Sequence, residues 1–188
     1  MNTHRHRGKH MNRILLSLFL LVAIKAVHAD PRLVDVRPGM PCDKVPEIEK
    51  RLGSLESSVD YSKGIMRYQG TLGGEKAVIL YHCEQGKLTE LKMIVTSSTQ
   101  EEALRFAGAQ KAELTEVLGK PIHDGLDLKF WEKFYFGFMG ADLDYLSSVV
   151  VWGKTEEDTM ILIRETAENQ WEVSVSRGSS KWEYILNS

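Results

Sequence analysis

Residues 87–102, with the sequence KLTELKMIVTSSTQEE, contain the change from strand to helix that decides the fold. Apolar residues occupy every second position from 91 to 95, which predicts a strand over Lys87–Thr96 with one mainly buried face. The motif at 99–102 is a capping box, in which Thr99 caps a helix and Glu102 reaches back to its start. The segment therefore predicts a half-buried strand that leads directly into a helix.

The second helix continues from this capping box on a single apolar stripe that stops at Gly119. A first helix is predicted over Asp43–Leu52, ended by Gly53, with Pro46 tolerated only in the first turn. The stripe of the second helix is formed by Ala103, Ala107, Leu114, Val117 and Leu118.

Strands are predicted after each helix. The first group covers residues 65–72, 76–83 and 87–96, and the second covers 128–138, 148–152, 159–164 and 171–177. This order predicts an α+β fold of two tandem helix-then-antiparallel-meander repeats, with the helices packed on one face of the sheet. Because no linker divides the chain, we expect repeats over 30–97 and 98–188 to form one compact unit.

Residues 1–29 have the pattern of a secretory signal peptide. Basic residues precede an apolar run from Ile14 to Ile24, and Val27-His28-Ala29 offers a small-residue cleavage site before Asp30. The run is shorter than the roughly 20 residues of a membrane span, and no cysteine follows it directly to carry a lipid. We therefore expect a periplasmic or secreted protein without a stable membrane anchor.

Removal of residues 1–29 would leave an acidic chain. The charged residues of that segment are all basic, so residues 30–188 carry 19 Lys and Arg against 26 Asp and Glu, a formal net charge of −7. Such a surface repels phosphate groups and anionic lipid headgroups, which disfavours nucleic acid and membranes as partners. It favours another protein as partner, and a basic one in particular.

The sequence contains two cysteines, Cys42 and Cys83. In an exported protein such a pair predicts one disulfide, and closing a loop of about 40 residues would stabilise the fold by roughly 3–4 kcal/mol. A reactive thiol activated by His82 is the alternative. Adjacent residues of a strand point to opposite faces, however, so the disulfide is the preferred interpretation.

Sequence motifs typical of enzymes are missing, including the nucleophile elbow, the zinc-protease motif and the phosphate-binding loops. His123, with Asp124 or Asp127, is conceivable as a general base, but we expect a solvated loop histidine. Asp142 and Asp144 resemble a calcium-ligand pair without the rest of an EF-hand, which predicts an acidic turn. We therefore expect no catalytic residue, metal or cofactor.

Aromatic residues crowd positions 130–138. On the predicted strand 128–138, Phe134, Phe136 and Phe138 would face the core, which leaves other aromatic side chains partly exposed. Tyrosine and tryptophan with charged neighbours commonly anchor protein interfaces. The side chains expected to contact a protein partner are Trp131, Tyr135, Tyr68, Trp152 and Trp182.

The pattern Gly39-Met40, four residues, Val45 and then Leu52-Gly53 resembles the start of a known repeat. It is similar to the repeat of β-lactamase inhibitory protein and of BamE-type (SmpA/OmlA) envelope proteins. In these families a short helical segment leads into antiparallel strands. The inhibitor has two tandem copies whose sheets form a concave protein-binding face, and the order of elements over residues 36–177 is similar.

These features together predict an exported, non-catalytic protein-binding module, of the inhibitor or immunity type, that acts through an exposed sheet face. Two alternatives remain open. The resemblance allows an accessory factor of envelope assembly, and unfamiliar spacing of site residues would allow a small secreted hydrolase or carbohydrate-binding module.

Overall fold

The computed structural model describes residues 29–60, 63–154 and 157–179 and confirms the α+β class. The predicted signal segment lies outside these residues, apart from Ala29. The strands are β1 (Leu55–Asp60), β2 (Ile65–Leu72), β3 (Glu75–Glu84), β4 (Lys87–Ser97), β5 (His123–Asp124), β6 (Val149–Lys154), β7 (Glu157–Glu165) and β8 (Trp171–Ser179). The helices are α1 (Pro31–Asp35), α2 (Val45–Arg51), α3 (Gln100–Leu118), α4 (Phe130–Phe138) and α5 (Leu143–Ser147), with short 3₁₀ turns η1 (Cys42–Lys44) and η2 (Gly125–Asp127).

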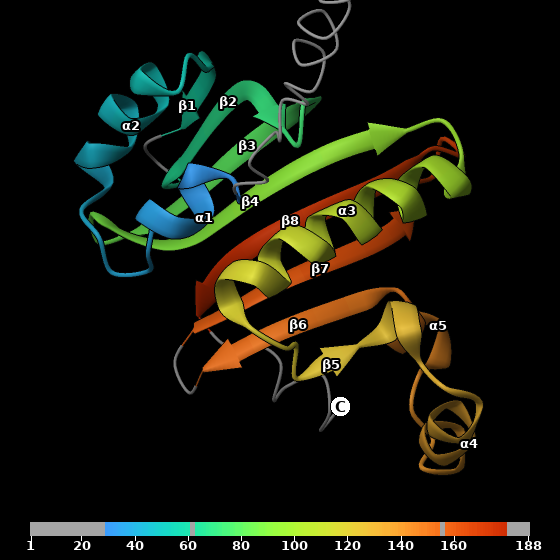
Figure 1. Ribbon diagram of the computed structural model, residues 1–188. Coiled ribbons are helices and arrows are strands. Elements are labelled where there is room, and N and C mark those ends of the chain that lie inside the picture. The colour runs from blue at the N-terminus through green and yellow to red at the C-terminus, as the bar shows by residue number, and fades with distance from the viewer. Residues whose placement is uncertain (1–28, 61–62, 155–156, 180–188) are drawn as a thin grey trace, which may run out of the picture.

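The eight strands form a single antiparallel sheet in the order β1-β2-β3-β4-β8-β7-β6-β5. Each half of the chain contributes a meander, and the two meanders join where β4 pairs with β8, for example at Met93 and Val175. Strands from distant parts of the sequence therefore lie side by side at the centre of the sheet (Figure 1).

The core lies on the sheet face that α3 covers. Helix α3 runs across β7 and β8 (Figure 1) and buries Ala103, Ala107 and Leu114 against them. One row of directly paired and buried residues crosses six strands beneath it, from β2 to β6. This row consists of Tyr68, Ile79, Met93, Val175, Ile161 and Val150.

Helix α3 begins and ends as predicted. The Thr99 hydroxyl accepts a hydrogen bond from the backbone N–H of Glu102 at 3.2 Å, and Gly119 ends the helix with a φ of 83°, a conformation that glycine adopts without steric cost. The reciprocal bond is displaced by one residue, because the Glu102 carboxylate accepts from the N–H of Ser98 instead of Thr99.

The first predicted helix divides into two parts, the 3₁₀ turn η1 and then α2. Pro46 lies in the first turn of α2, where its missing N–H costs no intrahelical bond. Gly53 follows the helix with a φ of 74°. The short elements α1 and β1 were not predicted.

The aromatic run 130–138 forms helix α4, so the predicted strand over Leu128–Phe138 is wrong. The Glu132 carboxylate accepts a hydrogen bond from the backbone N–H of Lys129 at 2.8 Å, which fixes the first helical turn. The aromatic spacing fits a helix as well as a strand, because Phe130, Phe134 and Phe138 recur every four residues.

Within the described residues, no helix combines the length and the apolar character needed to cross a membrane.

Candidate functional site

Helix α4 exposes most of its aromatic side chains. The core prediction for the phenylalanines is wrong, because Phe138 is 81% exposed, Phe134 is exposed and Phe136 is only half-buried. At 100° per residue, the exposed side chains form two adjacent rows on one side of the helix. One row consists of Phe130, Phe134 and Phe138, and the other of Trp131, Tyr135 and Met139.

The opposite side of α4 attaches it to the β5 edge of the sheet. The Phe136 ring lies edge-to-face on the His123 ring, with centroids 6.2 Å apart. Helix α4 also lies against α5, where a Cβ at Gly137 would be 3.4 Å from the Leu143 side chain, an ordinary contact distance. Helix α4 extends beyond the sheet (Figure 1), and its aromatic rows are exposed to solvent.

Helix α5 is held in turn by the sheet. Asp142 caps α5 by accepting the N–H of Tyr145 at 3.0 Å, so the acidic pair 142–144 is a helix start. The His123 Nε2–H donates to the Leu146 carbonyl at 2.9 Å, and Leu146 itself is buried. These contacts connect β5, α5 and α4 into one corner of the molecule.

The acid–base group that was conceivable for His123 with Asp124 or Asp127 does not assemble, and the expected solvated loop histidine is not present either. His123 is half-buried in β5 and does not lie in a solvated loop. Because adjacent strand residues point to opposite faces, Asp124 lies on the α3 side, where it and Asp127 pair with Lys111. Burial lowers the pKa of Lys111, but its hydrogen bonds to Asp127 and Asp124 outweigh burial and raise it.

The aromatic side chains that were predicted to contact a protein partner differ in their exposure to solvent. Trp131 and Tyr135 are exposed side by side on α4. Tyr68 and Trp152 are 3% and 4% exposed, so their predicted exposure is wrong. Both face the core: Tyr68 packs edge-to-face on Tyr81, and the Trp152 indole N–H donates to the carbonyl of Gly119 at 2.9 Å. Trp182 lies outside the described residues.

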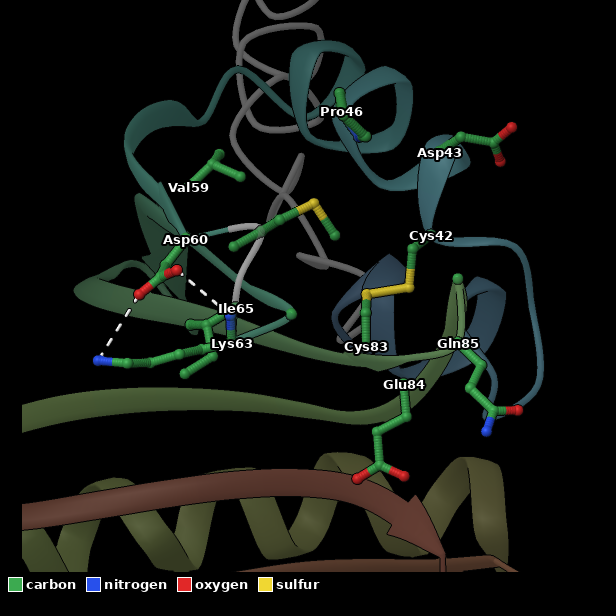
Figure 2. A pocket seen from close by; sticks show the side chains of 13 residues that line it. Cys42, Asp43, Pro46, Val59, Asp60, Lys63, Ile65, Cys83, Glu84 and Gln85 are labelled. Atoms are coloured by element: carbon green, nitrogen blue, oxygen red, sulfur yellow. Dashed lines mark hydrogen bonds and ion pairs between the residues drawn. A yellow bond between two sulfur atoms is a disulfide. The ribbon is translucent and has the colours of Figure 1, made fainter.

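A cavity of about 760 Å³ lies at the other end of the sheet, beside the predicted disulfide (Figure 2). The bond between Cys42 and Cys83 is present, which removes the possibility of a free catalytic thiol at Cys83. The disulfide and Pro46 bound the cavity on one side, and Val59 and Ile65 on the other (Figure 2).

Backbone hydrogen bonds hold the segment that carries Cys42. Residues 39–42 lie along the start of β4, where Gly39 N–H donates to Leu88 O at 2.7 Å and Leu88 N–H donates to Met40 O at 2.9 Å. The N–H of Cys42 donates to Gly86 O at 3.0 Å. The disulfide is therefore part of a wall that is also fixed through the main chain.

A buried charged group anchors α1 and α2 against the sheet. The Arg32 guanidinium pairs with Glu49 at 2.7 Å and with Asp30 at 2.8 Å, and it also donates to Ser54 at 2.8 Å. The Tyr81 hydroxyl of β3 donates to Glu49. Burial raises the pKa of Asp30 despite the neighbouring Arg32, and burial together with Glu49 raises the pKa of Tyr81.

Sequence reasoning missed this charged group and the helical state of 130–138. One available signal was Glu49, which lies four residues after Val45 and so on the buried side of the helix. A carboxylate at such a position predicts a buried cationic partner.

Among the described residues, no cluster of His, Cys, Asp and Glu could hold a metal ion. Comparison of the chain with protein-family models, curated proteins and solved structures found no significant match.

Proposed function

We propose that this protein is an exported, non-catalytic protein-binding module whose contact surface is centred on α4. The single observation that carries the proposal is the double row of large apolar side chains that α4 turns toward solvent. Soluble proteins seldom expose a contiguous apolar patch of this kind unless it binds something. An exposed apolar surface on a helix is compatible with an inhibitor or immunity-type protein, which acts by binding another protein.

The size of the surface supports a protein partner. A fully covered aromatic side chain buries about 150–250 Å². The five aromatic residues on the outer side of α4 are already partly covered, with exposed fractions between 57% and 86%, so they would contribute roughly 500–900 Å² to an interface. This approaches the ~800 Å² that each partner contributes to a standard interface. A helix that presents anchors at every fourth residue suits an apolar groove of a partner.

The charges around α4 favour a basic rim on that groove. Lys129 and Lys133 border the aromatic rows, but Asp127, Glu132, Asp142 and Asp144 outnumber them. Complementary charge on the partner would speed association and exclude acidic competitors.

The repeat architecture belongs to the same proposal. We propose that β1–β4 and β5–β8 are two tandem repeats, each introduced by helical segments on one face of the sheet. The mirror-like strand order about the β4–β8 pair supports this division. Under the resemblance to β-lactamase inhibitory protein, the face opposite α3 would add contacts at its exposed positions on β2 and β4, which include Arg67, Gln69 and Thr96.

The test is capture of partners from a periplasmic extract on the immobilised protein with its disulfide intact. We expect one stoichiometric partner that is lost with the pair Trp131→Ala and Phe134→Ala. Leu55→Ala is the matched control, because Leu55 is 71% exposed at the opposite edge of the sheet. A partner retained by the α4 variant, or no partner at high bait concentration, would contradict the proposal.

A further inference from the structure

The cavity beside the disulfide has the size and lining of a small-molecule site. Its volume of about 760 Å³ falls within the ~300–1,000 Å³ of typical ligand pockets. Four apolar side chains and the disulfide line it, so burial of a hydrocarbon chain would drive binding. The apolar side chains are those of Pro46, Val59, Ile65 and Met66.

The walls of this cavity are fixed before a ligand arrives. The disulfide ties η1 to β3, and Glu49 ties α2 to Arg32 and Tyr81 in the buried charged group. On the other wall, the paired strands β1 and β2 hold Val59 opposite Met66. A preformed site of this kind loses little conformational entropy on binding.

Charge at the rim selects the ligand. The charged residues that line the cavity are Asp43, Asp60 and Glu84 against the single Lys63, and Lys63 pairs with Asp60 at 3.7 Å. The side chains of Asp43 and Glu84 extend away from the cavity on different sides of its mouth (Figure 2). The lining therefore carries a net negative charge, which favours a positive group at the mouth while the apolar part of the ligand lies inside.

We infer that this cavity binds a small amphiphilic cation, that is, an aliphatic chain that ends in an ammonium group. The chain occupies the apolar interior, and the ammonium group lies at the mouth, where the net negative charge of the rim attracts it. The site is independent of the proposed protein contact, because it lies at the β1–β2 end of the sheet and α4 lies at the β5 end (Figure 1).

Three probes of equal chain length test the inference on the full, oxidised protein: decylammonium, decanol and decanoate. Titration calorimetry measures affinity, and methyl NMR signals of Ile65 and Met66 locate the bound chain. Because a charge pair that is exposed to solvent contributes little binding free energy, we expect decylammonium to bind only about three- to tenfold more tightly than decanoate. Decanol should have an affinity between those of the two ions. Unchanged Ile65 and Met66 signals at about 1 mM probe, or equal affinity for the two ions, would overturn the inference.

Variants separate the two parts of the site. The pair Asp43→Asn and Glu84→Gln should reduce decylammonium affinity to the decanol value and leave decanol unchanged. The pair Glu165→Gln and Glu168→Gln is the matched control, because it removes two exposed carboxylates at the turn between β7 and β8. Val59→Trp should fill the cavity and abolish binding of all three probes, with an unchanged melting temperature as the check on folding. Equal loss in the control pair would show that only overall charge acts and would contradict the inference.

Discussion

The hydroxyl of Tyr81 on β3 donates a hydrogen bond to the carboxylate of Glu49 on α2, and both side chains are completely buried. The same carboxylate pairs with Arg32, which reaches it from α1. A single acceptor thus connects the two N-terminal helices to the sheet. Because α2 also borders the disulfide cavity, this connection positions part of the candidate ligand site.

Loss of Glu49 should strongly destabilise the fold. Among the described residues, Glu49→Ala leaves the buried Arg32 with Asp30 as its one charged partner, and breaking a buried pair in this way costs about 3–5 kcal/mol. Urea unfolding measures the change in the free energy of unfolding. Glu47→Ala, on an exposed position of the same helix, should change it by less than about 0.5 kcal/mol. Equal effects of the two variants would contradict the anchoring role.

Alkaline pH should weaken the fold through Tyr81. Its pKa is raised in the folded protein, so above about pH 10 an unfolded chain releases this proton while the folded chain retains it. The stabilisation is complete below the unfolded pKa and is lost as pH rises above it. In urea titrations from about pH 8 to 11, the wild type should lose its stability advantage over Tyr81→Phe, and a constant difference would refute the assignment.

Opening the disulfide should cost stability without changing the class of fold. On the chain-entropy model, a closed loop of about 40 residues contributes roughly 3–4 kcal/mol. The pair Cys42→Ser and Cys83→Ser should lower the free energy of unfolding by about this amount, with circular dichroism unchanged at low temperature. A thiol assay on denatured, unreduced wild type should detect no free thiol.

Truncation of an aromatic side chain should change the stability of the fold little on α4 and strongly in the core. Phe134→Ala removes an exposed side chain and should change stability by less than about 0.5 kcal/mol, while binding of a hydrophobic dye decreases. Tyr68→Ala leaves a cavity in the core and should cost about 3–5 kcal/mol. A large loss of stability in Phe134→Ala would place that side chain in the core after all.

Local sequence signals determined much of the fold. Patterns within short segments predict the strands at 65–72 and 87–96 and helix α3 with its Thr99 cap and Gly119 stop. The even number of cysteines predicts the disulfide. Alternation and capping depend on near neighbours, so no knowledge of the rest of the chain was required.

Tertiary structure alone decided the rest. The aromatic spacing at 130–138 fits the period of a helix and the period of a strand equally well. The region forms a helix and pairs with none of the strands of the sheet. Tyr68 and Trp152 are buried because the pairing of β2 with β3 and of β6 with β7 places them on the core face of the sheet. The joining of β4 to β8 and the meeting of Arg32, Glu49 and Tyr81 likewise depend on contacts between distant segments. Periodicity describes which side of an element is apolar, but only the packed chain determines what covers that side.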